Sequence, residues 1–319
     1  MMITMKEKAK TITNEILKAL ETVKSEKPLT VGLTNNVTIN DCTNAMLAVG
    51  GTAAMFDDDE DGADFAAIAQ SFVINIGKLN RMSIKIIKES CKRTDENNTP
   101  VIIDPVGISV TENRKNIIKY LIKNHNITCI KGNMSEIRAV GDLMEITKDS
   151  TTGAVGVDAN DNDLISEKNL RENAAIVKKI AKNLNIIIVA SGPIDLISNG
   201  EQTYSISNGD EMMSLITGSG CMLSMIVGVY ESVNNPFIGA IAATAHMGIA
   251  GEKASEYVKE NKAALSAIGR GNNIADLYLA HFLGAGGAKK FFTSPVSGLV
   301  TAWADAKSLA ANKTIFYKN

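Results

Sequence analysis

Short, continuous apolar runs alternate along this chain with longer segments in which apolar residues recur every three or four positions. The clearest apolar runs are Leu29–Leu33, Phe72–Ile76, Val101–Ile103, Ile127–Ile130 and Ile186–Ala190. Because apolar and polar residues do not alternate within these runs, they are typical of strands that are covered on both faces. The pattern predicts an α/β fold with a mainly parallel central sheet and helices on both of its faces.

Helical periodicity fills the intervals between these runs. The predicted helices are Thr43–Val49, Met82–Arg93, Arg114–Asn124, Glu136–Val140 and Glu167–Leu184. A β-hairpin is predicted from Ile194–Ser198 and Thr203–Ser207, because the Asn199-Gly200 pair between them suits a type I′ turn. We expect one domain over residues 1–283, followed by an extension over residues 284–319 whose role the sequence leaves open.

Composition narrows the class of protein. The 319 residues are 45% hydrophobic and carry a net charge of −2, so a sizeable core is expected and a nucleic-acid partner is not. The lysine-rich N-terminus lacks the apolar stretch of a secretory signal, and no segment is apolar enough to predict a membrane span. Four widely spaced cysteines predict neither a zinc site nor a disulfide framework, which favours a reducing cytoplasm: Cys42, Cys91, Cys129 and Cys221.

The segment Ile216–Cys221 carries the most specific chemistry, because Gly218, Ser219 and Gly220 precede an apolar run that predicts a buried helix. Glycines allow close backbone approach, and the first turn of a helix offers N–H groups and a positive dipole end, so the segment suits a phosphate. Cys221 would lie where an attacking hydroxyl needs a proton acceptor, and a helix N-terminus can lower a thiol pKa. Taken alone, such a segment is more often a tight loop-to-helix junction.

Polar residues follow three of the predicted strands. Asp104 follows one strand, Lys131 and Glu136 follow the next, and Ser191 follows a third. Each alone is typical of a turn or a helix cap, but the carboxyl ends of parallel strands meet at one edge of a sheet. Carboxylates, an ammonium group and a hydroxyl at one edge suit magnesium-nucleotide chemistry. Since no Gly-x-x-x-x-Gly-Lys-[Ser/Thr] motif is present, we expect the phosphate site at Gly218–Cys221.

Several motifs occur in an order that resembles one family. They are Thr34–Asn40, Thr43-Asn44, Leu47–Met55, Asn75–Leu79, Asp104–Gly107, Lys131–Ile137 and Thr217–Cys221. Over roughly residues 28–250 the chain resembles the hydroxyethylthiazole kinases, thiamine-salvage enzymes with a ribokinase-like fold. The resemblance therefore implies a ribokinase-like α/β fold and an ATP-dependent kinase.

The resemblance also implies roles for individual residues. Met55 and Gly218 would contact the thiazole alcohol, with Asn35 and Val37 nearby. Lys131 and Ser191 would contact ATP, although the family more often has arginine and threonine there, so nucleotide affinity is open. Asp104 and Glu136 would help to place Mg²⁺, and Cys221, with Gly218, Ser219 and Gly220, would act in catalysis.

The family is trimeric with its substrate sites between subunits, so the resemblance implies a homotrimer in which the segment around Met55 completes a neighbour's pocket. The predicted reaction is phosphorylation of the primary alcohol of 4-methyl-5-(2-hydroxyethyl)thiazole. Two alternatives stay open: a kinase for a related alcohol such as hydroxymethylpyrimidine, and a non-catalytic protein that binds nucleotide or thiazole.

Two further motifs have more than one interpretation. The acidic run Asp57–Asp61 favours a solvated helix N-terminus over a metal site. The motif Asn75–Gly77 fits a substrate loop or a strand-end turn equally well.

Overall fold

The computed structural model describes residues 5–147, 164–271 and 273–294. The chain divides into two compact units, residues 1–249 and residues 250–319. The predicted boundary between residues 283 and 284 falls inside the second unit, and the division of the chain into a kinase domain and an extension stays a prediction. Most of that extension, including Trp303, lies outside the described residues.

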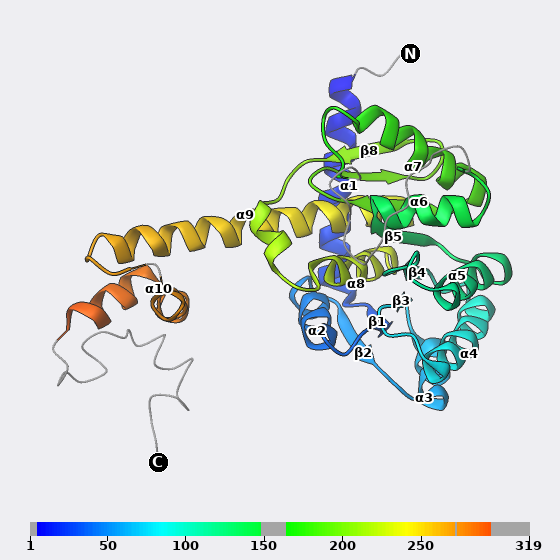
Figure 1. Cartoon of the computed structure of the whole chain (residues 1–319), viewed down its shortest axis with the longest axis horizontal. Coiled ribbons are helices and arrows are strands. Elements are labelled where there is room, and N and C mark those ends of the chain that lie inside the picture. The colour runs from blue at the N-terminus through cyan, green and yellow to red at the C-terminus, as the bar shows by residue number, and fades with distance from the viewer. Residues whose placement is uncertain (1–4, 148–163, 272, 295–319) are drawn as a thin grey trace. The chain divides into compact units, whose positions relative to one another are not determined.

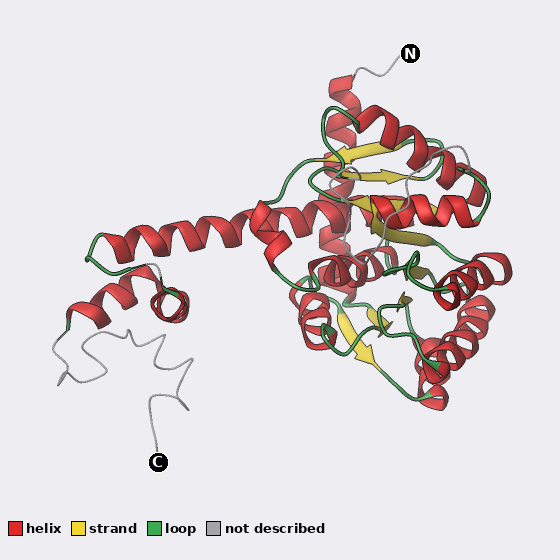
Figure 2. Ribbon diagram, viewed as in Figure 1, coloured by secondary structure: helices red, strands yellow, loops and turns green. Residues whose placement is uncertain are grey.

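The first unit is built on an eight-stranded sheet (Figure 2) with the order β2-β1-β3-β4-β5-β6-β7-β8. The strands from β2 to β6 run parallel, and β7 and β8 are antiparallel additions at one edge. Their bounds are β1 Leu29–Leu33, β2 Thr52–Met55, β3 Ser71–Asn75, β4 Val101–Asp104, β5 Cys129–Asn133, β6 Ile187–Ser191, β7 Asp195–Ser198 and β8 Thr203–Ile206.

The five predicted strands are confirmed. Their predicted and observed ends agree within two residues, except that β5 ends three residues later than predicted. The prediction missed β2, because Thr52–Met55 is a short edge strand of small residues that is only partly buried. The hairpin of β7 and β8 is confirmed, but the type I′ turn is wrong. Ser198 pairs with Thr203, so the connection has four residues, and Asn199 Oδ1 accepts the N–H groups of Glu201 and Gln202.

Helices cover both faces of the sheet (Figure 1), as predicted. Side chains of α3 to α7 pack on one face, whereas those of α1, α2, α8 and the first part of α9 pack on the other. The bounds are α1 Met5–Glu26, α2 Ile39–Ala48, α3 Asp59–Ile68, α4 Arg81–Asn97, α5 Glu112–Asn124, α6 Met134–Leu143, α7 Leu170–Leu184, α8 Ser219–Glu231, α9 Pro236–Ser266 and α10 Ile274–Thr293, with a short 3₁₀ helix, η2, at Glu211–Leu215.

The strand sequences explain why both faces are apolar. Side chains along a strand point alternately to opposite faces. In β3, Phe72 and Ile74 belong to the cluster under α3 to α7, and Val73 belongs to the cluster under α1, α2, α8 and α9. In β4, Ile103 belongs to the cluster under α3 to α7, and Ile102 belongs to the cluster on the other face. Continuous apolar runs therefore fill two cores at once.

The second unit contains the outer part of α9 and α10. Its small core includes Leu265, Ala280 and Ala288. Arg270 donates to Asp276 Oδ1 at 2.8 Å and stacks over the ring of Phe292. These contacts hold the turn between the two helices against α10. Within the described part of the chain, no helix is long and apolar enough to cross a membrane.

Candidate functional site

The carboxyl ends of four neighbouring parallel strands supply polar side chains to one edge of the sheet. Asn75 ends β3 and lies in register with Asp104, the last residue of β4. Lys131 lies within β5, and Ser191 ends β6 in register with Asn133. The sheet therefore brings together the residues that the strand-end pattern placed at one edge, as predicted for parallel strands.

The loop before α8 reaches this edge and presents the Cys221 thiol. Gly218 is the N-cap of α8 with φ +84°, a left-handed conformation that favours glycine. Asn75 Nδ2 donates to Cys221 Sγ at 3.2 Å, and Asn35 Nδ2 does so at 3.7 Å. The predicted helix and its Gly-Ser-Gly opening are confirmed, and the sulfur lies among amide donors.

Burial, together with the nearby Asp104 carboxyl, raises the pKa of the Cys221 thiol above its ordinary value. The expectation that the helix N-terminus would lower this pKa is wrong in the isolated chain. The helix dipole acts, but removing the thiol from water disfavours the thiolate more strongly. Cys221 therefore keeps its proton at neutral pH and acts first as a hydrogen-bonding group.

Asp104 is 2% exposed and is held by two donors. Asn75 Nδ2 and Ser224 Oγ donate to Asp104 Oδ2, at 2.8 and 2.7 Å. Burial raises the pKa of this carboxyl, and the positive charge of Lys131 opposes the rise. A single Asn75 amide thus contacts both the carboxyl on β4 and the thiol on α8.

Lys131 connects the sheet edge to the glycine loop. Its Nζ is buried with the rest of the side chain and donates to the carbonyl oxygen of Gly220 at 2.9 Å. A Cβ atom on Gly220 would lie 3.1 Å from that Nζ, so a larger residue there would press on the ammonium group. Lys131 therefore lies beside the Gly218–Cys221 segment, as predicted.

Glu136 caps its own helix. Its Oε2 accepts the N–H of Asn133 and its Oε1 accepts the N–H of Gly107, at 2.9 and 3.0 Å. Burial first, and then the negative charge of Asp104, raise the pKa of Glu136 to about 7. The predicted pair of carboxyls thus lies close enough for the two groups to repel each other.

Ser191 and Asp195 lie at the far end of the edge. Ser191 Oγ donates to the carbonyl of Gly132 at 3.3 Å, and Asp195 Oδ1 accepts the N–H of Gly192 at 2.9 Å. Burial raises the pKa of Asp195 to about 6, against the attraction of Lys131. Asp195 was not predicted as a site residue, although an acid four residues beyond a strand-end serine was a readable signal.

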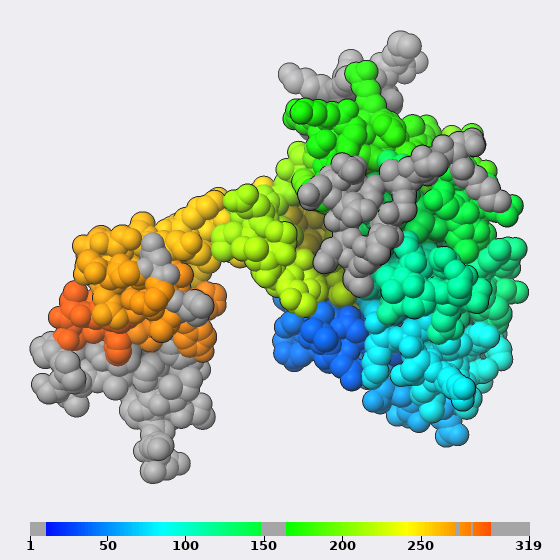
Figure 3. Space-filling view, viewed as in Figure 1, coloured from blue at the N-terminus to red at the C-terminus, as the bar shows by residue number. Residues whose placement is uncertain are grey.

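The segment after β1 places the remaining predicted residues. Asn35 Oδ1 accepts the N–H groups of Val37 and Thr38, so the turn is fixed while the Asn35 amide faces Cys221. Val37 is 75% exposed. Met55 ends β2 beside Gly32 and packs against the same buried apolar cluster as Cys221. Figure 3 shows α2 (blue) and the η2 segment (yellow-green) at the surface, where Leu215 is 81% exposed.

Besides Asp195, three site residues were not predicted as such. The motif Asn75–Gly77 proves to be both a turn and part of the site, because Asn75 Oδ1 accepts the Gly77 N–H while Nδ2 reaches Asp104 and Cys221. Ser224 was readable as the polar residue one turn after Gly220 in an apolar run. Thr38 gave no signal beyond its motif.

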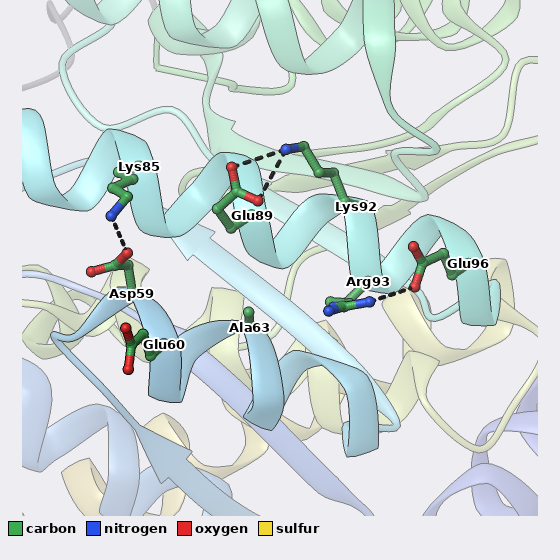
Figure 4. Close-up of a pocket in the computed structure, with 8 residues that line it drawn as sticks. All are labelled: Asp59, Glu60, Ala63, Lys85, Glu89, Lys92, Arg93 and Glu96. Carbon is green, nitrogen blue, oxygen red and sulfur yellow. Dashed lines mark hydrogen bonds and ion pairs between the residues drawn. The ribbon is translucent and has the colours of Figure 1, made fainter.

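A charged pocket lies elsewhere, between α3 and α4 (Figure 4). Lys85 pairs with Asp59, Lys92 with Glu89 and Arg93 with Glu96. The preferred interpretation of the acidic run is supported, since Asp58 caps α3 by accepting the N–H groups of Glu60 and Asp61. Across the described residues, no group of three or more His, Cys, Asp or Glu side chains is arranged for a metal ion.

Comparison with known proteins places the chain in a family. The profile of the hydroxyethylthiazole kinase family matches residues 20–268. The chain belongs to the hydroxyethylthiazole kinase family. It is 45% identical over 249 residues to a hydroxyethylthiazole kinase of Methanobrevibacter smithii, covering 78% of this chain and 86% of that one. A hydroxyethylthiazole kinase of Alkaliphilus oremlandii is 39% identical, with 77% and 86% covered.

A solved hydroxyethylthiazole kinase structure from Pyrococcus horikoshii OT3 superposes with a TM-score of 0.65 at 25% identity, over 83% of this chain and 91% of that one. The resemblance read from the motifs and the ribokinase-like fold class are therefore confirmed. The family match ends at residue 268, so α10 lies beyond the part shared with the hydroxyethylthiazole kinase family.

Proposed function

We propose that this chain transfers the γ-phosphoryl group of ATP to the primary hydroxyl of 4-methyl-5-(2-hydroxyethyl)thiazole. One observation carries the proposal within this kinase family. The Cys221 thiol, which can hold an alcohol, is three residues from Gly218 at a helix N-terminus that can hold a phosphoryl group. Lys131 holds the same loop through the Gly220 carbonyl.

The alcohol would lie against Gly218 and Met55, with Asn35 and Val37 beside it. Asn35 supports this role because its amide faces Cys221. Glycine at 218 allows the left-handed turn (φ +84°) and the close contact with the Thr38 methyl group that shape the loop before α8.

Lys131 and Ser191 would contact the nucleotide. Lys131 supplies positive charge, and Ser191 supplies a hydroxyl at the end of β6. Lysine lacks the bidentate fork of the arginine usual at this position, so a single charge contact is expected here.

Asp104 and Glu136 fit a magnesium ion that arrives with the nucleotide. Both are oxygen donors, which Mg²⁺ prefers. Burial raises the pKa of both groups, and the negative charge of Asp104 raises the pKa of Glu136 further, so a cation between them would stabilise their charged forms. When bound, such an ion would neutralise charge on the phosphate oxygens. Mg²⁺ commonly uses one or two carboxylates plus phosphates and water, so a pair suffices.

The protein's own residues then act mainly by position. Cys221 Sγ accepts the hydrogen bond of the substrate hydroxyl and directs its oxygen toward the phosphorus. As the new O–P bond forms and the bond from the γ-phosphorus to the β-phosphate oxygen of ATP breaks, the hydroxyl proton passes to an oxygen of the transferred phosphoryl group. A loose phosphoryl transfer needs little base strength, and the Cys221 thiol already holds its own proton. The N–H groups of Gly220 and Cys221 in the first turn of α8 stabilise charge on the transferred oxygens.

A homotrimer and a cytoplasmic location complete the proposal. Exposed apolar side chains support an interface near the site, namely Val37, Ile39, Leu47, Leu215 and Ile216. All four cysteines are free thiols, which supports a reducing compartment. Light scattering of the purified chain tests the trimer, and a monomer would contradict it.

An ADP-release assay with several alcohols tests the proposal. We expect turnover with hydroxyethylthiazole above hydroxymethylpyrimidine, and a loss of about tenfold to a hundredfold in kcat for Cys221→Ala, because the group that positions the substrate hydroxyl is removed. Cys221→Asp should retain more activity than the alanine variant. Thermal-shift binding of ATP and thiazole without ADP release would instead favour a non-catalytic binding protein, and preference for the pyrimidine would favour the other alternative.

A further inference from the structure

Arg114 lies in the first turn of α5, where a positive charge is ordinarily unfavourable. Thr111 is the N-cap of this helix, and its side chain accepts the N–H of Arg114. The N-terminus of a helix carries the positive end of the helix dipole, so acidic side chains stabilise it and cations do not. The place of this arginine therefore needs another explanation, and its hydrogen bonds supply one.

The guanidinium group of Arg114 donates to three backbone carbonyl oxygens in two loops. Nη1 donates to the carbonyl of Ile76 at 2.8 Å and also to that of Val106, and Nη2 donates to the carbonyl of Gly77 at 3.0 Å. Ile76 and Gly77 follow β3, whereas Val106 follows β4. A planar guanidinium holds its N–H donors in a fixed fork, which suits separate oxygens better than the single nitrogen of lysine. One side chain therefore joins the two loops.

The bridge lies just beyond the point where β3 and β4 stop pairing. The last register pair of the two strands is Asn75 with Asp104, and the N–H of Ile76 donates to the Asp104 carbonyl at 3.1 Å. Both residues of this pair belong to the site, since the Asn75 amide donates to the Asp104 carboxyl and to the Cys221 sulfur. Every carbonyl that Arg114 holds is within two residues of Asn75 or Asp104.

The same two loops carry hydrogen bonds that orient polar side chains of the site. Gly77 donates its N–H to Asn75 Oδ1 at 2.9 Å, which sets the direction of that amide, while Arg114 holds the Gly77 carbonyl. Gly107, the residue after Val106, donates its N–H to Glu136 Oε1. A shift of either loop would therefore turn the Asn75 amide or release the Glu136 carboxyl.

We propose that Arg114 is a positioning residue for the kinase reaction: it fixes the loop after β3 against the loop after β4 and so holds Asn75 toward Cys221. The proposal rests on the proposed function of this edge of the sheet. The three hydrogen bonds of Arg114 reach the site through the backbone. Their loss should therefore appear in kcat, which depends on alignment, more than in the KM for either substrate.

Two substitutions separate the shape of the guanidinium from its charge. Arg114→Lys keeps the positive charge but presents it from one nitrogen, and Arg114→Met removes the charge and keeps a flexible chain. Arg270→Lys is the matched control, because Arg270 also donates through its guanidinium, to Asp276, and stacks over Phe292, but belongs to the second unit.

The first measurement is hydrogen–deuterium exchange followed by mass spectrometry, which needs no activity. In both Arg114 variants, peptides that contain the N–H groups of Ile76, Gly77 and Gly107 should exchange about tenfold faster than in wild type, as expected when charge-assisted hydrogen bonds that order a loop are lost. Peptides from the interiors of β3 and β4 should change much less, because those amides exchange only when the sheet opens.

The second measurement is kcat together with the KM for hydroxyethylthiazole and for ATP. We expect kcat to fall about tenfold to a hundredfold in both Arg114 variants, with a change of less than about threefold in either KM. Arg270→Lys should match wild type in kcat and in the exchange of the two loops.

Several results would overturn the proposal. They are an unchanged kcat or unchanged loop exchange in Arg114→Lys, the same loop exchange in Arg270→Lys, and acceleration of the β3 and β4 interiors by the same factor as the loops. A rise in the KM for ATP in Arg114→Met that is absent in Arg114→Lys would also overturn it, since that would indicate a direct charge contact. If Arg114→Met does not fold, Arg114→Lys carries both measurements. Absence of kinase activity in the wild type would refute the proposed function, while the exchange rates would still decide whether Arg114 holds the two loops.

Discussion

Glu231, at the end of α8, is a buried acid that makes stability depend on pH. It is 1% exposed, and neither carboxyl oxygen has a hydrogen bond of normal geometry within the described residues. The neighbouring polar group is the thiol of Cys129, a weak donor. Burial raises the pKa of Glu231 well above its ordinary value of 4.5, so the folded protein holds this proton where the unfolded chain releases it.

The sign of the effect follows from proton linkage. Above pH 4.5 the unfolded chain binds fewer protons at this residue than the folded chain, so the free energy of unfolding falls as pH rises toward the raised pKa. The slope is about 1.4 kcal/mol for each pH unit. Glu231→Gln keeps the shape and removes the titration, so its stability relative to wild type should improve by about 1.4 kcal/mol between pH 5 and pH 6.

Urea unfolding at several pH values measures this difference, and taking the difference between variant and wild type cancels the titration of other buried groups such as Asp195. The same substitution at Glu89 on α4, whose side chain is 43% exposed, controls for the chemistry of the change. A constant difference between Glu231→Gln and wild type from pH 5 to pH 6 would refute the reasoning, because it would mean that Glu231 titrates alike in both states.

Two further variants test the site. Gly218→Ala should abolish detectable turnover and cost about 1–3 kcal/mol of stability, because φ is +84° and the new Cβ would overlap Thr38; ADP release and urea unfolding measure both, and normal turnover would contradict the close packing. Lys131→Met should raise the KM for ATP about tenfold or more with a smaller effect on the KM for the alcohol, since it removes a buried charge beside the phosphate loop; an equal effect on both KM values would place Lys131 elsewhere in the mechanism.

Much of the architecture could be read from the sequence because burial on both faces leaves continuous apolar runs. β1 was predicted at its observed bounds, and the joint placement of Asp104, Lys131 and Ser191 followed from parallel strands ending at one edge. β2 could not be found in this way, since an edge strand is covered less and needs fewer apolar residues.

The details of the site were harder to predict from the sequence. The pKa of Cys221 depends on how far the thiol is removed from water, and a helix N-terminus in the sequence says nothing about that depth. The Asn75 contacts depend on which way an amide turns between β4 and α8, which lie far apart along the chain. Such directions emerge from packing, and no local pattern encodes them.

The distances along the chain that the site bridges have a consequence for folding kinetics. Asn35 and Cys221 are 186 residues apart, and Asp104 and Ser224 are 120 apart, so closing the site requires long loops to be ordered first. In refolding from urea, helical signal should therefore return before catalytic competence, because local helices need no such closure. Turnover in this protein reports the last stage of assembly, when α8 has docked across β3 and β4.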